Sequence, residues 1–317
     1  MRIFASAAIA FASAAALAQY PDHPVRIIVG FPAGGPTDIV ARLFAERAGA
    51  SFRQSFVVEN KPGANSIIAT DAVATSKPDG YTLLGAAQNH AMIPALYSDR
   101  VTFDSAKSFA PLCIVAKSPT VLVVSPNLGV KTLPEFLQKI RDEPGKHTYA
   151  SVGIGSAVHL ATENFLSLTK LSMTHVPYKG APPATTALLA GEVDAYLATI
   201  GSVMPQVKAG KLLAIAVAAD ERSKLLPDVP TFAEGGVKGF SAEVWYGLLA
   251  PAGTPEAILR SVEKEADGFS KDSAIRDRLV AAGIEPVLTC GAAFGNRLAT
   301  EIATYSRLVK ALNIKVE

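Results

Sequence analysis

The sequence predicts an α/β protein made of two lobes joined by two crossing strands. Strand and helix patterns alternate along almost the whole chain, which is typical of layered α/β folds. An apolar run from Leu112 to Val124, broken once by a Lys-Ser-Pro segment, is long enough to leave one lobe and enter a second. The strand-like stretch Trp245–Ala250 can return beside it. We therefore place lobe 1 at residues 19–122 and 246–317, and lobe 2 at residues 123–245.

The first lobe opens with a strand, a glycine-rich turn and a helix. Apolar residues alternate from Val25 to Phe31, as in a strand, and the stretch Pro36–Arg47 repeats apolar residues at helical spacing. Short apolar runs bounded by Pro, Gly, Asn and Asp then alternate with a helical stretch. These later elements are strand Phe56–Asn60, helix Ile67–Thr75 and strand Tyr81–Gly85.

The middle of the chain repeats the alternation of strands and helices. Thr132 can cap a helix at Lys131–Arg141, and Ser156 can cap a second helix at Ala157–Thr169. The remaining elements are strand Thr148–Ser151, strand Met173–Val176, helix Pro183–Ala190, strand Val193–Ala198, helix Val203–Lys208 and strand Leu212–Ala218. Three further helical stretches follow Ala250 and complete the prediction.

The first 18 residues have the pattern of a secretion signal. Their apolar part, Ile3–Ala18, follows a single charge at Arg2 and is shorter than the ~20 residues that a membrane-spanning helix needs. Ala16-Leu17-Ala18 fits the small-x-small pattern of a cleavage site before Gln19. The alternative is a buried N-terminal helix. We expect residues 1–18 to be a signal peptide and the mature protein to be exported to the periplasm.

Composition limits the partners and the covalent chemistry. The 30 Lys and Arg against 28 Asp and Glu give a net charge of +2, which is too near neutral to suggest nucleic acid or a membrane surface as a partner. We expect a monomer. The two cysteines, Cys113 and Cys290, either pair in an oxidising compartment or remain two separate buried thiols, because two cysteines carry no spacing signal.

The turn between the first strand and the first helix is a candidate anion site. Gly34 and Gly35 allow unusual backbone geometry, while Thr37 and Asp38 can cap the helix, so free N–H groups and a helix dipole point at one spot. Gly155–His159 opens another helix in the same way, and Gln88-Asn89-His90 adds neutral hydrogen-bonding groups after a strand. Ordinary turns, simple N-capping by Ser156 and a polar loop surface remain the alternatives.

Signatures of catalysis, metals and cofactors are incomplete. Pro36 stands where a phosphate-binding loop has its lysine, and Val158 stands at the third glycine position of a dinucleotide loop. Ser66, Ser156 and Ser202 lack the Gly-x-Ser-x-Gly context of a nucleophile elbow. His159 and Glu163 share a helix face, but no third ligand lies at a recognised spacing. We expect no cofactor, no metal and no enzymatic activity.

Several segments, in their order along the chain, carry a resemblance to a known family. They are Pro24–Val29, Phe31–Asp38, Val57–Ala64, Pro78–Leu84, Gly155–Glu163, Val176–Gly180, Gly191–Asp194 and Leu249–Pro255. In this order the chain resembles the periplasmic substrate-binding proteins of tripartite tricarboxylate transporters, called the Bug family. The resemblance implies a type II periplasmic binding protein fold that closes around a small carboxylate compound.

The resemblance also implies which residues touch the ligand. The first-lobe loop and the facing second-lobe loop hold one carboxylate, and Asp194 matches the position that contacts the variable end of the ligand, unless it merely caps a turn. The segment Ala195–Ser202, which includes Thr199, and the pair Gln88-Asn89 depart from the family pattern, so they bear on ligand identity. Lys179 either contributes a charge or is a solvated loop lysine. The candidates are Phe31, Gly35, Thr37, Asp38, Gln88, Asn89, His90, Ser156, His159, Lys179, Asp194 and Thr199.

The predicted function is a periplasmic solute-binding protein that delivers a small carboxylate to the permease subunits of a tripartite tricarboxylate-type transporter. One alternative is a ligand-sensing receptor on the same fold, which hands its closed form to a signalling partner. The other is a periplasmic hydrolase that uses Ser156 and His159, although no acidic third member is visible beside them.

Overall fold

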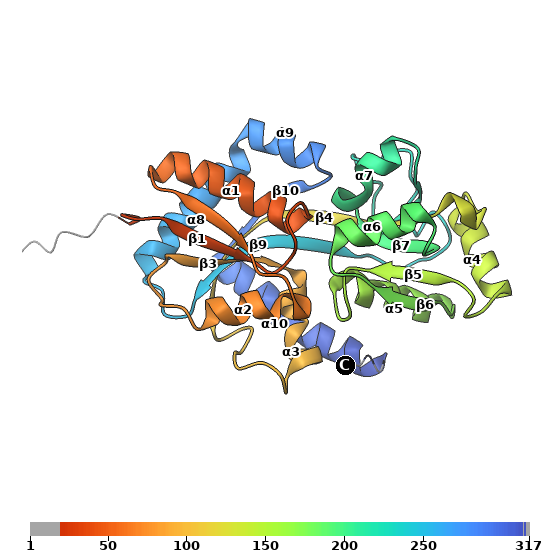
Figure 1. The fold of residues 1–317 in the computed structure, drawn as a ribbon, viewed down its shortest axis with the longest axis horizontal. Helices are drawn as coiled ribbons and strands as arrows, with labels where there is room; N and C mark the ends of the chain where they lie inside the picture. The colour runs from red at the N-terminus through yellow and green to blue at the C-terminus, as the bar shows by residue number, and fades with distance from the viewer. Residues whose placement is uncertain (1–19, 313, 315–317) are drawn as a thin grey trace, which may run out of the picture.

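The computed structural model describes residues 20–312 and 314, and it has two lobes that lie side by side along the long axis of the molecule (Figure 1). The predicted signal peptide, residues 1–18, lies outside the described residues. Two strands, β4 (Phe109–Val124) and β9 (Glu243–Pro251), run through the region where the lobes meet. The predicted two-lobe α/β fold is confirmed. Part of β4, Phe109–Pro119, pairs with β9, and its last part, Thr120–Val124, pairs with β7.

Lobe 1 has a sheet in the order β2-β1-β3-β9-β4, with β10 also paired to β4. Strand β1 is parallel to both β2 and β3. The elements of this lobe before the crossing are β1 (Val25–Val29), α1 (Pro36–Phe52), β2 (Phe56–Asn60), η1 (Ala64–Ser66), α2 (Ile67–Ala74), β3 (Thr82–Ala87), η2 (Gln88–Ala91) and α3 (Ile93–Tyr97). Those after the return are α8 (Glu256–Lys271), α9 (Ser273–Ala281), β10 (Glu285–Cys290) and α10 (Gly291–Ala311).

Lobe 2 continues from β4 through β7, β5 and β6, with β8 paired to β4. Strand β5 is parallel to both β6 and β7, and each of these three strands is followed by a helix. The elements are η3 (Pro126–Leu128), α4 (Leu133–Asp142), β5 (Thr148–Ser151), α5 (Ala157–Thr169), β6 (Thr174–Pro177), α6 (Ala181–Ala190), β7 (Ala195–Thr199), α7 (Ile200–Lys208) and β8 (Leu213–Val217).

Aromatic side chains anchor the core of each lobe. In lobe 1, Phe44 of α1 and Phe269 of α8 are both 1% exposed, and their rings lie 5.7 Å apart. In lobe 2, Phe165 of α5 packs against Phe232 and Phe240 at 5.2 and 5.6 Å. Each such side chain contributes about 1.5–3 kcal/mol when it is fully buried. These contacts pack α1 against α8, and α5 against the segment between β8 and β9.

The main departure from the predicted elements is β10, which falls where only helical stretches were expected. Its residues are mostly half-buried and do not alternate between buried and exposed positions, and Pro286 within it weakens the strand signal. Its pairing with β4, which joins positions 177 residues apart, is a tertiary effect that local sequence does not encode. Smaller differences are the extension of α1 from Arg47 to Phe52 and the start of β9 at Glu243.

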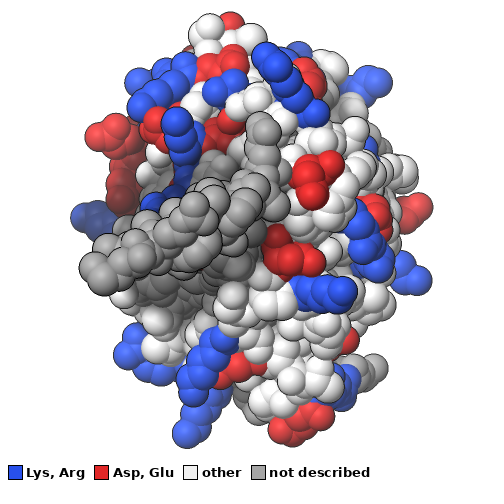
Figure 2. Space-filling model, turned by 90° about the vertical axis from the view of Figure 1, so that its left-hand side faces the viewer, with Lys and Arg blue, Asp and Glu red and all other residues white. Residues whose placement is uncertain are grey.

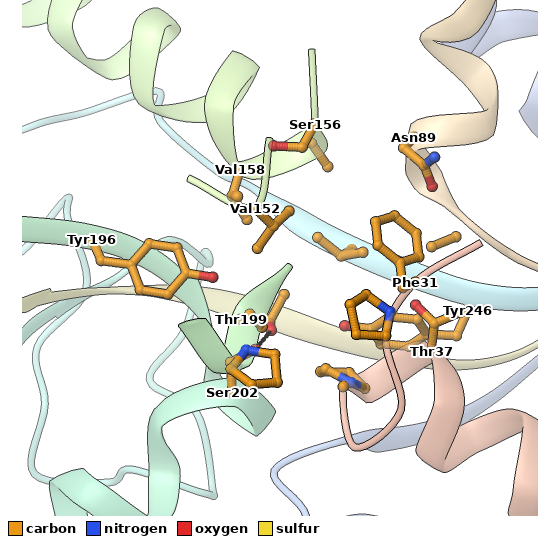
Figure 3. Close-up of a pocket in the computed structure, with 18 residues that line it drawn as sticks. Phe31, Thr37, Asn89, Val152, Ser156, Val158, Tyr196, Thr199, Ser202 and Tyr246 are labelled. Atoms are coloured by element: carbon orange, nitrogen blue, oxygen red, sulfur yellow. Dashed lines mark hydrogen bonds between the residues drawn. The ribbon is translucent and has the colours of Figure 1, made fainter. Parts of the chain in front are cut away.

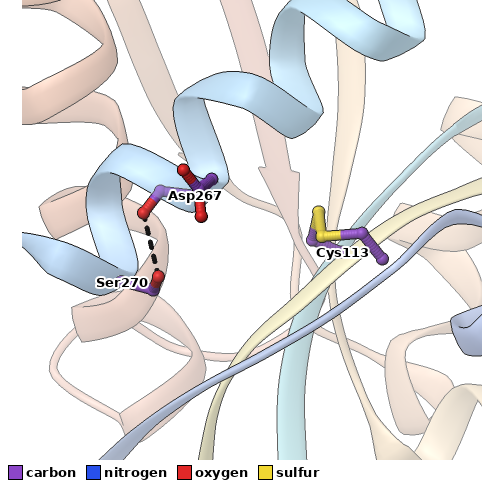
Figure 4. Close-up of a disulfide and its surroundings, with 4 residues drawn as sticks. Cys113, Asp267 and Ser270 are labelled. Atoms are coloured by element: carbon purple, nitrogen blue, oxygen red, sulfur yellow. Dashed lines mark hydrogen bonds between the residues drawn. A yellow bond between two sulfur atoms is a disulfide. The ribbon is translucent and has the colours of Figure 1, made fainter.

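A disulfide joins β4 to β10. Cys113 and Cys290 are register partners in the antiparallel pair, with their Cα atoms 4.0 Å apart and their sulfurs bonded. Figure 4 shows the bond beside α8, where the Ser270 hydroxyl donates to the Asp267 carbonyl at 2.9 Å. Of the two states that the sequence left open, the structure has the paired one.

The surface carries charges of both signs. On the face of the molecule drawn in Figure 2, Lys and Arg are interspersed with Asp and Glu. Several pairs are in contact, such as Arg26 with Glu59 at 2.6 Å and Arg278 with Glu46 at 2.7 Å. Exposed pairs of this kind contribute about 0–1 kcal/mol each. Within residues 20–312, the structure has no helix that is both long and apolar enough to cross a membrane.

Candidate ligand-binding site

A pocket lies between the two lobes, at the ends of strands from both sheets. It has about 550 Å³ of space not occupied by atoms, its open mouth included. Lobe 1 lines it with residues that follow β1 and β3, and lobe 2 lines it with residues that follow β5, β6 and β7 (Figure 3). Ligands of α/β proteins bind at the carboxyl ends of the strands, which is where this pocket lies.

Four helices begin at this pocket. Gly35 is the N-cap of α1, Ser156 the N-cap of α5 and Thr199 the N-cap of α7, and the first turn of α6 contributes Ala181 and Pro182. The first N–H groups of a helix have no partner within the helix, and its N-terminus carries a partial positive charge of roughly +0.5. The pocket therefore offers an anion the positive ends of four dipoles and unpaired N–H donors, with the fewest donors in α6, because its second and third residues are Pro182 and Pro183.

The lining is uncharged and mostly apolar, with a small number of hydrogen-bonding side chains. Of the residues that line the pocket, none is Lys, Arg, His, Asp or Glu. The side chains with hydrogen-bonding groups are Thr37, Asn89, Ser156, Tyr196, Thr199, Ser202 and Tyr246. An anion placed here would meet backbone N–H groups and hydroxyls rather than charged side chains.

Three hydroxyls stand on the lobe 2 side of the pocket. The hydroxyls of Thr199 and Ser202 are 2.6 Å apart and hydrogen-bonded to each other. The hydroxyl of Tyr196 points into the pocket and is buried (Figure 3). It lies near the Ser202 hydroxyl but makes no hydrogen bond of ordinary geometry to any residue that the structure describes. Burial raises the pKa of Tyr196 well above its usual range, so the group stays a neutral phenol and can donate. The sequence analysis related the segment Ala195–Ser202 to ligand identity but named only Thr199 in it as a candidate, whereas Tyr196 and Ser202 also line the pocket.

Asn89 and Asn65 connect the pocket to the opposite lobe. The Asn89 side-chain nitrogen donates to the Asn65 carbonyl at 2.8 Å, and the Asn65 side chain donates across the lobes to the Gly155 carbonyl at 2.9 Å. The Tyr97 hydroxyl makes a second such bond, to the Ile154 carbonyl at 3.1 Å. The loop that opens α5 is thus tied to lobe 1, and the structure holds its lobes in contact.

Asp38 braces the first loop and does not line the pocket. Its carboxylate accepts hydrogen bonds from the Gly34 N–H at 3.0 Å, from Arg42 at 2.9 Å and from Asn60 at 2.8 Å. Burial opposes ionisation, but these three donors keep the pKa of Asp38 below its ordinary value. The charge of Asp38 is therefore balanced inside lobe 1, and Asp38 fixes the loop that carries Gly35.

His159 supports the second loop from beneath. Its Nδ1 accepts the Gly155 N–H at 3.0 Å, and its ring stacks on His175 at 4.0 Å. Burial, with a smaller effect from His175, lowers the pKa of His159 to about 3, so the ring is neutral. The backbone N–H of His159 donates to the Ser156 hydroxyl at 3.3 Å, which is the predicted N-cap. This bond positions Ser156 as a helix cap, and nothing in it favours the hydrolase alternative.

The structure brings part of the predicted set together in the pocket. The members that line it are Phe31, Gly35, Thr37, Asn89, Ser156 and Thr199. The members that do not line it are Asp38, Gln88, His90, His159, Lys179 and Asp194.

The remaining predicted residues lie elsewhere. Gln88 lines a neighbouring cavity, Lys179 is exposed, and His90 is buried against the Ser105 carbonyl at 2.8 Å. Asp194 immediately precedes β7, whereas the pocket lies at the opposite end of that strand. Its carboxylate accepts the Thr148 N–H at 2.8 Å, the arrangement of the turn-capping alternative. Within the part of the chain that the structure describes, no group of three potential metal ligands is found.

Replacing His90 with Gln is expected to make the free energy of unfolding less dependent on pH between pH 7 and pH 5. Burial lowers the pKa of His90 from 6.5 to about 4, so the unfolded chain binds the proton more readily than the folded one. Stability from this group is therefore complete above pH 6.5 and falls as the pH drops towards 4, by about 2 kcal/mol between pH 7 and 5. Gln keeps a donor for the Ser105 carbonyl and does not titrate.

Urea unfolding of both proteins at pH 7 and pH 5 measures this difference. The variant should lose about 2 kcal/mol less than the parent on acidification. An equal loss in the two proteins would mean that His90 does not titrate as its burial implies.

Comparison with known proteins adds a second line of evidence. Residues 40–314 match the model of a family described as "Tripartite tricarboxylate transporter family receptor". The chain is 32% identical to protein BugT of Bordetella pertussis, over 94% of this chain and 92% of BugT. It is similar to R. palustris Rpa4515 with adipate, with a TM-score of 0.89, 31% identity, and 93% of this chain and 99% of that one covered. It is also similar to MatC from Rhodopseudomonas palustris with bound malate, with a TM-score of 0.84 and 31% identity. That comparison covers 92% of this chain and 100% of MatC.

Proposed function

Because this chain belongs to the family of tripartite tricarboxylate transporter receptors that includes the Bug proteins, we propose that it captures a small carboxylate between its lobes and delivers it to a membrane transporter of that type. The protein acts in the periplasm as a solute-binding protein and not as an enzyme. The observation that carries the proposal is the convergence of four helix N-termini on a pocket lined by uncharged residues. Two structural relatives have carboxylates bound, adipate in one and malate in the other.

The energetics require donors from both lobes. Micromolar affinity corresponds to about 8 kcal/mol. A hydrogen bond to a charged group contributes about 1.5–3 kcal/mol, and association costs at least ~4 kcal/mol. The donors of α1 alone fall short of the sum. Donors from α1 in lobe 1 and from α5, α6 and α7 in lobe 2 together reach it.

Closure of the lobes is the step that ligand binding drives. The anion binds the N–H groups of one lobe, and closure then adds the donors of the other lobe and the bond from Asn65 to the Gly155 carbonyl. Ligand shifts this equilibrium only by its extra affinity for the closed form. The closed form presents both lobes together to the membrane components of the transporter.

Calorimetry of the mature protein tests the proposal. Malate, succinate, adipate, lactate and propionate are titrated singly, and at least one is expected to bind with micromolar affinity. Glucose, a neutral compound, is the control and should give no heat of binding. If none of the carboxylates binds, the proposed function fails.

Tyr196→Phe is expected to weaken carboxylate binding by about 10- to 150-fold, the equivalent of one hydrogen bond to a charged group. The stability of the ligand-free protein should be unchanged or slightly higher, because the hydroxyl that is removed is buried without a partner. Calorimetry and thermal unfolding measure the two effects.

Tyr149→Phe is the matched control for Tyr196→Phe. The Tyr149 hydroxyl is hydrogen-bonded to Glu163 outside the pocket, so this variant should lose stability and keep its affinity. Unaltered affinity in Tyr196→Phe would remove the Tyr196 hydroxyl from the binding site.

A further inference from the structure

The side-chain amide of Asn89 is held in a single orientation. Its Nδ2 lies 2.8 Å from the backbone carbonyl of Asn65, which can only accept, so the nitrogen must be on that side. The oxygen, Oδ1, is consequently on the other side, and Figure 3 shows it directed towards Phe31 and the pocket. Asn89 is 3% exposed, and its Oδ1 accepts no hydrogen bond from any donor in the structure.

A buried oxygen of this kind needs a hydrogen-bond donor, and because Asn89 lines the pocket, the ligand is placed to supply it. An ionised carboxylate has only acceptors, so a carboxylate placed against Asn89 would set two acceptors facing each other. The carboxylate is instead held by the helix N-termini that begin with Gly35, Ser156 and Thr199. A second group on the ligand, one with an N–H or O–H, donates a hydrogen bond to the Asn89 oxygen.

The uncharged lining favours a hydroxyl as this second group over an ammonium. No Asp or Glu is among the pocket-lining residues, so an ammonium would be buried without a counter-charge in the protein. A hydroxyl needs no counter-charge and donates one hydrogen bond, which is what the Asn89 oxygen lacks.

We propose that Asn89 selects hydroxy acids, so that the ligand of this protein is a small carboxylate that also bears a hydroxyl group. The proposal rests on the proposed function and narrows its ligand class. In the binding complex the Asn89 oxygen accepts the ligand hydroxyl, the Asn65 carbonyl keeps the amide from turning over, and the helix N-termini hold the carboxylate.

Pairs of ligands that differ by a hydroxyl test this selection. Malate is compared with succinate, and lactate with propionate, by calorimetry of the full mature protein. In at least one pair the hydroxylated member is expected to bind about tenfold more tightly, the equivalent of one net hydrogen bond. Aspartate, which carries an ammonium in place of the malate hydroxyl, should bind more weakly than malate.

Asn89→Leu assigns the selection to this side chain. The variant has no acceptor at this position, and the ratio between the two members of a pair should fall to about one. Because the ratio is measured within each variant, a general loss of affinity or of folded protein does not affect it. Asn164→Leu removes a carboxamide that lines a neighbouring cavity and should keep the tenfold ratio.

Each outcome decides the proposal. Equal binding of both members of every pair by the parent protein would overturn the selection and leave carboxylate capture standing. A ratio that persists in Asn89→Leu would assign the hydroxyl to another residue and overturn the role of Asn89. Binding of aspartate in preference to malate would overturn the choice of a hydroxyl. Failure of all these acids to bind would overturn the proposed function and this inference together.

Discussion

Gly35→Asp is expected to reduce carboxylate affinity by at least 100-fold while the fold remains intact. Gly35 is the N-cap of α1 with φ −80° and ψ 164°, a conformation open to any residue, and an added Cβ would meet only the Pro32 carbonyl at 3.6 Å. An aspartate at an N-cap accepts hydrogen bonds from the first N–H groups of the helix. It would therefore occupy the donors that the ligand needs and place a like charge beside it.

The stability of this variant should change in the opposite direction to its affinity. Helix α1 has no side-chain cap in the parent protein, and relative to Gly an N-cap residue with a side-chain acceptor contributes about a few tenths of a kcal/mol. Thermal unfolding should show a protein at least as stable as the parent, and calorimetry should show the loss of binding.

Gly35→Asn separates charge from shape. Asparagine has the size of aspartate and also caps helices, but it is neutral, so its affinity should lie between those of the parent and Gly35→Asp. If Gly35→Asp bound carboxylates as tightly as the parent, the N-terminus of α1 would not be an anion site, and the main support for the proposed function would be lost.

The parts of the site that sequence predicted are the parts that local sequence determines. A glycine turn between a strand and an amphipathic helix exposes N–H groups wherever it occurs. Gly35 and Thr37 could therefore be predicted as site residues without knowledge of the fold. Ser156 precedes its helix with a capping side chain, which is also a local signal. Both loops line the same pocket in the structure.

The remaining members depend on topology, which no short segment reveals. Tyr196 and Tyr246 stand among apolar residues in strands, a pattern that predicts positions in the core. In the structure, β7 and β9 bring both side chains to the pocket. Asp194 and Thr199 lie at opposite ends of one strand, and only the sheet order shows which end meets the other lobe. Asp38 and His159 were predicted members of the site, but their side chains form hydrogen bonds within their own loops and do not line the pocket.

The disulfide is a feature that the sequence left undecided, and its place in the fold predicts a large effect on stability. Changing both Cys113 and Cys290 to Ala is expected to lower the free energy of unfolding by about 2–5 kcal/mol. The two positions are 177 residues apart, and the closed loop contains the whole of lobe 2. In the chain-entropy model, long loops gain the most from closure, because the cross-link restricts the unfolded chain.

Urea unfolding under oxidising conditions measures this effect, with the reduced parent protein as the matched control. The reduced parent and the double variant should unfold at similar urea concentrations, both below that of the oxidised parent. Affinity for the ligand should be the same in all three, because neither cysteine lines the pocket and α1 is also packed against α8 through Phe44 and Phe269. Equal stability of the oxidised parent and the double variant would show that the link adds nothing. A parallel loss of affinity would show instead that the bond between β4 and β10 sets the relative position of the lobes.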